Sequence, residues 1–271
     1  MSEKSIAKFG LIVIGDEILS GKRQDAHFSN MTKLLGQYHL SLDWAHYLGD
    51  NPTAIVALLQ QTMASEDVVF CTGGIGATPD DHTRRCVAQV AGVPLMLHPE
   101  AEALIAQRIL DLANGDAKKS DFSQVENRRR FEMGMFPAGA QVIPNGYNSI
   151  PGFSLGRHYF FPGFPVMTEP MMDWVLKNFY ARDGRVDWQE YSFFVFGVSE
   201  AILTPLMEDI EQQYPGVKVF SLPSLGEGQR GAQWARPHIE LGVKGIEVDV
   251  TRAWAQLSAA VRASGAEVIS V

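Results

Sequence analysis

The segment from residue 72 to residue 83 holds the residues whose types and spacing could most readily do chemistry. Its sequence is Thr-Gly-Gly-Ile-Gly-Ala-Thr-Pro-Asp-Asp-His-Thr. It follows a run at 67–71 that is typical of a buried strand, and it precedes a helix-like stretch at 84–91. Glycines let backbone N–H groups approach a ligand closely, and a helix N-terminus adds partial positive charge. The turn therefore suits a phosphate or a carboxylate.

Two adjacent carboxylates, Asp80 and Asp81, lie at this turn and indicate a hard divalent cation such as Mg²⁺ beside the phosphate. A structural alternative exists for each residue taken alone, because Asp commonly caps helices and glycines commonly make turns. The whole constellation favours a ligand site. It is not a Walker P-loop, since no Gly-Lys-Ser/Thr follows, and Gly74 and Gly76 lack the third glycine of the dinucleotide fingerprint.

Acidic residues also follow two earlier strands. The expected order of strand, helix, strand, helix, strand, helix predicts a parallel sheet with helices on both faces, whose ligands lie at the carboxyl ends of the strands. The loops at those ends carry Asp16, Glu17, Ser20 and Asp25 after the first strand and Asp50 after the second. Crowded carboxylates need a cation or a proton to offset their repulsion. For Asp16 and Asp25 a turn or capping role is an open alternative.

Hydrophobic patterning predicts two domains, 1–180 and 186–271, with a boundary at 181–185. In the first we expect strands at 9–14, 40–47, 67–71 and 157–161, helices at 27–38, 52–64, 84–91, 99–113 and 165–180, a short connection at 93–97, a solvated helix and loop at 114–130, and turns at 142–146 and 149–153. In the second we expect strands at 191–196, 217–221, 237–243 and 266–269, helices at 200–213 and 249–263, and a loop at 222–236 with a mobile tip at 226–231.

Composition excludes some classes of function. The 271 residues carry a net charge of −8, which argues against non-specific nucleic-acid binding because that needs a basic face. No apolar run is long enough for a membrane span, and the first residues lack the apolar core of a signal peptide, so we expect a cytoplasmic protein without a membrane partner. No Gly-x-Ser-x-Gly elbow is present, and neither the histidines nor the two cysteines have metal-ligand spacing.

A family resemblance adds to these patterns. Residues 73–83 resemble the signature of the molybdopterin-binding (molybdenum cofactor biosynthesis) domain. Further segments, at 15–21, 144–145, 151–153 and 162–165, resemble the N-terminal region of the competence/damage-inducible protein A family, and the similarity covers nearly the whole chain, more weakly after residue 185. This resemblance implies an α/β fold, a three-layer α/β/α domain with a mostly parallel sheet, followed by a small α+β domain.

The resemblance also implies a function. Family members bind molybdopterin or nucleotides; some cleave the pyrophosphate of ADP-ribose or FAD with a divalent metal such as Mg²⁺, Mn²⁺ or Co²⁺, and others adenylylate molybdopterin. It implies catalytic roles for Asp50 and Asp81, and a metal held by Asp50, Asp80 and Asp81. The expected ligand and phosphate contacts are Thr72, Gly73, Gly74, Ile75, Gly76, Thr78, Thr83, Asp16, Glu17, Ser20, Asp25, Asn145, Pro162 and Gly163. The partner is then a nucleotide or pterin phosphate, and the assembly a homo-oligomer, dimer or trimer.

Three departures from the family pattern keep two functions open. Ala26-His27 stands where Thr-Asn is usual after the acidic residue, and residues 197–201 replace a Gly-x-Gly-Glu-Ser pattern. The deamidase domain of full-length relatives has no counterpart here, so deamidation of nicotinamide nucleotides is not expected. The two functions are a metal-dependent nucleotide pyrophosphatase and a module that binds molybdopterin or a nucleotide without turnover, and a molybdopterin adenylyltransferase-like enzyme is a further alternative. The glycine loop and the acidic cluster argue against a scaffold that keeps only the fold.

Overall fold

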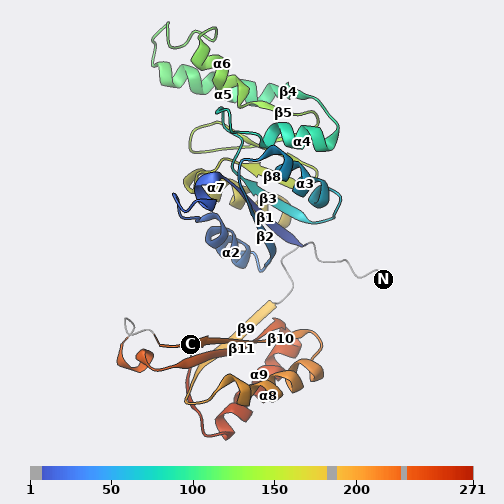
Figure 1. Ribbon diagram of the computed structural model, residues 1–271, viewed down its shortest axis with the longest axis vertical. Coiled ribbons are helices and arrows are strands. Elements are labelled where there is room, and N and C mark those ends of the chain that lie inside the picture. Colours follow the sequence, from blue (N-terminus) through green and yellow to red (C-terminus); the bar gives the residue numbers. More distant parts are fainter. Residues whose placement is uncertain (1–7, 182–187, 227–230, 271) are drawn as a thin grey trace. The chain divides into compact units, whose positions relative to one another are not determined.

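A computed structural model of the chain describes residues 8–181, 188–226 and 231–270. The chain divides into two compact units, residues 1–184 and 185–271, each with its own hydrophobic core (Figure 1). Most of the predicted boundary at 181–185, and residues 227–230 of the predicted mobile loop tip, lie outside the described residues. Within the described part, no helix is long and apolar enough to cross a bilayer.

A six-stranded, mostly parallel sheet forms the centre of the first unit, in the order β2-β1-β3-β8-β7-β6. Its strands are β1 (Phe9–Ile14), β2 (Leu42–Leu48), β3 (Val68–Thr72), β6 (Gln141–Ile143), β7 (Gly152–Leu155) and β8 (His158–Phe161). The strands β2, β1, β3 and β8 are parallel; β7 pairs antiparallel with β8, and β6 pairs antiparallel with β7. Val13 pairs with Thr72, and Thr72 with Phe161, so the carboxyl ends of three neighbouring strands are level. The loops that follow them must therefore converge.

Helices cover both faces of this sheet, as the α/β/α prediction required. The helices of this unit are α1 (Asp16–Leu19), α2 (His27–Gln37), α3 (Pro52–Met63), α4 (Thr83–Ala91), α5 (Pro99–Ala113), α6 (Val125–Glu132) and α7 (Pro165–Val175), with a π-helical turn η1 (Leu176–Tyr180). The α2 and α7 helices pack on one face against β1, β3 and β8. The α3 and α4 helices pack on the other. All six residues of β1 are buried, which explains why that strand is apolar throughout.

Some elements differ from the sequence prediction. Residues 142–146 and 149–153 were expected to be turns, but residues 142–143 belong to β6 and residues 152–153 to β7. The strands approach closely at Gly152, because a Cβ there would lie 2.4 Å from the carbonyl oxygen of Phe160. The predicted connection at 93–97 holds β4 (Leu95–Leu97), which pairs with β5 (Met135–Pro137). Figure 1 shows that α5, α6 and this small ribbon extend away from the main sheet.

The second unit is a four-stranded antiparallel sheet in the order β10-β11-β9-β12. Its elements are β9 (Trp188–Phe196), α8 (Glu200–Gln213), β10 (Val217–Ser224), the 3₁₀ helix η3 (Ala232–Ala235), β11 (His238–Ile246), α9 (Glu247–Ala263) and β12 (Glu267–Ser270). The α8 and α9 helices share one core with the sheet. The order β-α-β-β-α-β with interleaved pairing is the ferredoxin-like arrangement. The predicted α+β fold is confirmed.

Candidate functional site

The loop between β3 and α4 has a backbone that only glycine accommodates at two positions. Gly73 and Gly74 adopt positive φ angles of 94° and 67°. A Cβ at Gly73 would lie 2.1 Å from the carbonyl oxygen of Ile14, and a Cβ at Gly74 would lie 2.2 Å from Thr83 Oγ1. The loop is therefore pressed against the end of β1 and the first turn of α4.

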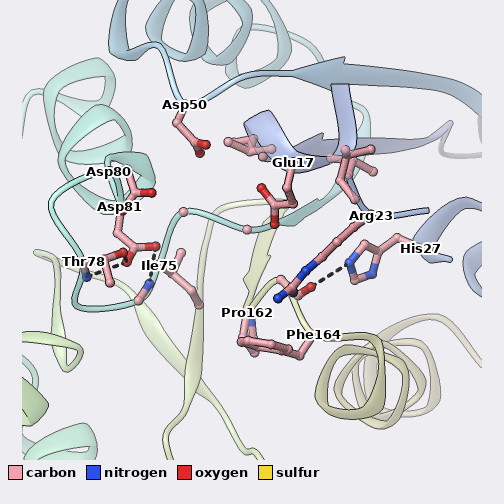
Figure 2. Close-up of a pocket in the computed structure, with 18 of the residues that line it drawn as sticks. Glu17, Arg23, His27, Asp50, Ile75, Thr78, Asp80, Asp81, Pro162 and Phe164 are labelled. Atoms are coloured by element: carbon pink, nitrogen blue, oxygen red, sulfur yellow. Dashed lines mark hydrogen bonds between the residues drawn. The ribbon is translucent and has the colours of Figure 1, made fainter. Parts of the chain in front are cut away.

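Asp81 holds the second half of this loop. Its Oδ1 accepts a hydrogen bond from Gly76 N–H (2.8 Å), and its Oδ2 accepts one from Thr78 N–H (2.7 Å) and one from Thr78 Oγ1 (2.6 Å) (Figure 2). Thr83 holds the first half, since its Oγ1 donates to Gly73 O (3.0 Å) and its N–H to Gly74 O (3.0 Å). Both side chains thus fix the shape of the loop.

Arg84 supports the loop from behind and was not among the residues expected from the sequence. Its Nη1 donates to Ile75 O and its Nη2 to Gly76 O, both at 2.5 Å, and the residue is only 8% exposed. Burial lowers the pKa of the guanidinium to about 10, which still leaves it charged at neutral pH. An arginine in the first turn of a helix opposes the helix dipole, so its position gave no sign of a supporting role.

The N–H groups of Gly74, Ile75 and Ala77 are among those of the loop that have no hydrogen-bond partner in the described structure. All three residues line one cleft. The carbonyl groups of Ile75 and Gly76 are taken by Arg84. Successive free N–H groups in a turn with left-handed residues, beside a helix N-terminus, form an anion-binding concavity.

The cleft has a volume of about 360 Å³, within the range of small-molecule sites. It lies at the carboxyl ends of β1, β2, β3 and β8, between the loops that leave those strands (Figure 2). The predicted site residues that line it are Glu17, Asp50, Gly73, Gly74, Ile75, Gly76, Thr78, Asp80, Asp81, Pro162 and Gly163. Asp16 and Ser20 lie in an adjoining hollow, which Glu17, Asp50 and Asp80 share.

The acidic end of the cleft is built around Asp50, which Figure 2 shows above Asp80 and Asp81. Its Oδ2 accepts a hydrogen bond from Asp16 N–H (2.9 Å), and Asp16 Oδ1 accepts one from Asp50 N–H (3.2 Å). Burial raises the pKa of Asp50, and the negative charges of Asp16, Glu17 and Asp80 raise it further. A cation at this place would relieve that repulsion.

Four predicted site residues line neither the cleft nor the adjoining hollow. Thr72 and Thr83 are buried beneath the loop. Asp25 holds the start of α2, because its carboxylate accepts hydrogen bonds from His27 N–H (2.8 Å), Phe28 N–H (3.1 Å) and Tyr47 Oη (2.7 Å).

Asn145 makes a turn beside β6. Its Nδ2 donates to Ile150 O (2.9 Å), and its Oδ1 accepts from Tyr147 N–H (3.0 Å). The capping alternative therefore describes the present contacts of Asp25, and the contacts of Asn145 are those of a turn; a ligand role for either residue stays a prediction.

The opposite end of the cleft is basic and aromatic and consists of Arg23, His27 and Phe164. His27 Nε2 lies 3.2 Å from Gly163 O, and burial lowers the pKa of this histidine, which favours the neutral ring as the donor. His27 could have been found from its place in a motif where Asn is usual. No sequence signal distinguishes Arg23 or Phe164, since exposed arginine and phenylalanine in loops are common.

The carboxylates of the cleft fit a divalent cation in one respect. Among the described residues, no group of three or more His, Cys, Asp or Glu side chains is arranged as a metal site. Mg²⁺ commonly takes only one or two carboxylates and completes its shell with water and substrate phosphates. Asp50 and Asp80 fit that pattern, whereas both oxygens of Asp81 already accept hydrogen bonds within the loop.

The fold and the cleft define an α/β domain that presents a glycine loop at the carboxyl edge of a mostly parallel sheet. The chain belongs to the family described as a probable molybdopterin binding domain, which matches residues 10–182. It is similar to the CinA-like protein of Anaeromyxobacter sp. (strain Fw109-5), with 30% identity over 93% of this chain and 58% of that protein. It is also similar to the CinA-like protein of Geotalea uraniireducens (strain Rf4), with 32% identity over 78% and 50%.

A solved structure supports the fold. The protein CinA from Thermoplasma acidophilum, described as of unknown function, superposes with a TM-score of 0.53 and 21% identity over 63% of this chain and 98% of that one. At this identity the likeness shows the fold alone. The chain spans about half the length of the two curated relatives above, 50% and 58%.

Proposed function

We propose that the cleft binds a nucleotide or pterin phosphate and that the protein is a divalent-metal-dependent nucleotide pyrophosphatase of the ADP-ribose or FAD type. The observation that supports this most strongly is the glycine loop, whose free N–H groups at Gly74, Ile75 and Ala77 line the same cleft as the carboxylate of Asp50. Phosphate oxygens bind to hydrogen-bond donors, and a metal ion bound to phosphate takes carboxylates as its protein ligands. The cleft contains both the N–H donors and the carboxylates.

The side chains around the cleft have two roles: some keep the glycine loop in its shape, and others would bind the metal ion. Arg84, Asp81 and Thr83 keep the loop in its shape before a ligand arrives, so binding would cost little reorganisation. Asp50 and Asp80 would hold the metal, and Asp16 N–H orients the carboxylate of Asp50. When bound, a divalent ion would supply charge neutralisation for the two phosphates.

The proposed reaction is a hydrolysis with a simple balance. Water adds to one phosphorus of the pyrophosphate, and the bridging P–O bond on that phosphorus breaks. The bridging oxygen leaves on the second phosphate, and the protons of the water pass to solvent at neutral pH. ADP-ribose gives AMP and ribose 5-phosphate, and FAD gives AMP and FMN. The loop N–H groups would stabilise the charge that builds on the phosphate oxygens.

The experiment is release of AMP from ADP-ribose and from FAD by the purified protein, with and without Mg²⁺, Mn²⁺ or Co²⁺. Asp50→Asn should remove metal-dependent release, because the amide keeps the size of the side chain and loses its charge. Glu100→Gln, in the first turn of α5 and outside the cleft, is the matched control and should keep full activity. Equal AMP release by wild type and Asp50→Asn, or no release with any metal, would overturn the proposed hydrolysis.

A binding module without turnover is the second candidate, and the contacts of Asp81 favour it. Asp81 was expected to act in catalysis, but both of its carboxylate oxygens accept hydrogen bonds from the glycine loop. The family description as a probable molybdopterin binding domain is consistent with this function. Binding of AMP or of a pterin phosphate by calorimetry, without hydrolysis under any metal condition, would support it.

A further inference from the structure

The basic and aromatic end of the cleft contains a cation over a ring. The guanidinium carbon of Arg23 lies 5.8 Å from the centroid of the Phe164 ring. Arg23 is exposed, and its side chain makes no ion pair with any carboxylate in the described structure. Figure 2 shows Arg23 reaching across the cleft towards Pro162 and Phe164. A charged side chain that is not paired with an acid is available to a ligand.

The backbone of Phe164 is held in place although the residue is 50% exposed. Phe164 is the N-cap of α7, and its carbonyl oxygen accepts hydrogen bonds from the N–H groups of Met167 (2.9 Å) and Thr168 (3.0 Å) and from Thr168 Oγ1 (3.0 Å). Pro165 follows at the first helical position and fixes the backbone further. The ring is thus an exposed flat surface on a rigid support.

This ring lies close to the phosphate loop. A Cβ added to Gly163, the residue before Phe164, would lie 3.5 Å from the Cα of Gly73. His27 bonds to the carbonyl oxygen of Gly163 and so ties the same loop to α2. The cleft therefore places three features in sequence: carboxylates around Asp50, N–H donors of the glycine loop, and then the ring with its cation.

We propose that Arg23 and Phe164 form a stacking subsite for the flat heteroaromatic ring of the ligand. The ring would lie on the face of Phe164, and the Arg23 guanidinium would swing aside by about one ring thickness and cover its other face. Stacking on an aromatic side chain and a cation over a π-system both stabilise such a ring. The proposal rests on the proposed function, because the phosphate of the same ligand must lie on the glycine loop.

The subsite sets the class of ligand. A phosphate that carries a nucleobase or a pterin would bind more tightly than a sugar phosphate or inorganic pyrophosphate, which have no ring to stack. Nucleobase and pterin share the chemistry that the subsite recognises, and the one of AMP and neopterin monophosphate that binds more tightly in the same assay identifies the source.

Calorimetry with AMP and with ribose 5-phosphate, both in Mg²⁺, tests the subsite. Wild type should bind AMP more tightly than ribose 5-phosphate. Phe164→Ala should weaken the affinity for AMP roughly ten- to hundredfold and leave the affinity for ribose 5-phosphate unchanged, while Phe164→Trp should keep the affinity for AMP. Val166→Ala removes a comparably exposed side chain of the same helix, outside the cleft, and should change neither affinity.

Arg23 is tested in the same assay. Arg23→Gln should weaken the affinity for AMP about two- to thirtyfold and should have less effect on the affinity for ribose 5-phosphate. Lys33→Gln is the matched control, since it removes an exposed cation from α2 outside the cleft and should leave both affinities unchanged. An equal loss for both ligands would mean that Arg23 contacts the phosphate, and it would overturn the stacking role of this residue.

The stacking subsite is overturned if wild type binds AMP and ribose 5-phosphate equally, or if Phe164→Ala keeps the preference for AMP. Replacement of AMP by neopterin monophosphate should show the same dependence on Phe164 if a pterin is the natural ring. Failure of hydrolysis alone, with the AMP preference and its loss in Phe164→Ala intact, overturns the pyrophosphatase and supports the subsite. No binding of either ligand overturns the stacking subsite, whereas the hydrolysis is decided by AMP release.

Discussion

Replacement of Arg84 by methionine tests whether the glycine loop depends on its buried support. The two hydrogen bonds from the guanidinium to Ile75 O and Gly76 O are lost, and hydrogen bonds from a charged group contribute about 1.5–3 kcal/mol each, so the gross loss is about 3–6 kcal/mol. Removal of the buried charge offsets part of this loss of free energy, because the guanidinium no longer has to be desolvated. We expect a net loss of about 2–4 kcal/mol in the free energy of unfolding of the first unit.

The assay is urea unfolding followed by hydrogen exchange in peptides from residues 8–181, which separates the first unit from the second, together with the AMP affinity by calorimetry. Arg85→Met is the matched control, since Arg85 is the next residue of α4 and is exposed; its effect should stay within about 0.5 kcal/mol. AMP affinity should fall at least tenfold in Arg84→Met, because the loop N–H groups lose their fixed positions. If Arg84→Met matches Arg85→Met in both stability and affinity, the supporting role is refuted.

Two further predictions concern a buried histidine and a strained glycine. Burial lowers the pKa of His158 to about 4, so as the pH falls the unfolded state binds the proton first. The free energy of unfolding therefore keeps its full value above pH 6.5 and declines by about 3 kcal/mol towards pH 4. His158→Gln, which can keep the hydrogen bond to Thr62, should show a smaller acid-dependent loss in urea titrations at pH 7 and 4.5, and an equal loss would contradict the assignment. Gly74→Ala should destabilise the first unit by about 1–3 kcal/mol and weaken AMP, because φ is +67° and the new Cβ would meet Thr83; an unchanged melting temperature would speak against it.

Hydrophobic periodicity was enough to predict the central strands and the helices that cover them. The β1 strand and the α3 helix are long and patterned, and Asn51 followed by Pro52 is a strong helix start, with Asn51 Oδ1 accepting from Thr53 N–H and Ala54 N–H. The β5 and β6 strands have three residues each and lie beside prolines, so their pairing depends on tertiary contacts that a local pattern does not record.

The candidate site was predictable to the extent that it depends on backbone chemistry. The glycines, Asp50 and Asp80 line the cleft because level strand ends bring their loops together. Arg23 and Phe164 come from segments 141 residues apart in sequence number, which no local pattern connects. The role of Asp25 could not be predicted for another reason. An acidic residue before a helix suits a ligand or a cap equally, and only the contacts of its carboxylate distinguish the two roles.

The strand order of the second unit has a consequence for how the chain folds during synthesis. The β9 strand, first in the sequence of this unit, lies in the interior of the sheet and pairs with β11 and with the last strand, β12. One edge of β9 therefore stays unpaired until residues 267–270 have left the ribosome. The first unit completes its sheet once β8 is made, whereas the second must wait for its final strand, with the N–H and C=O groups along one edge of β9 unpaired in the meantime.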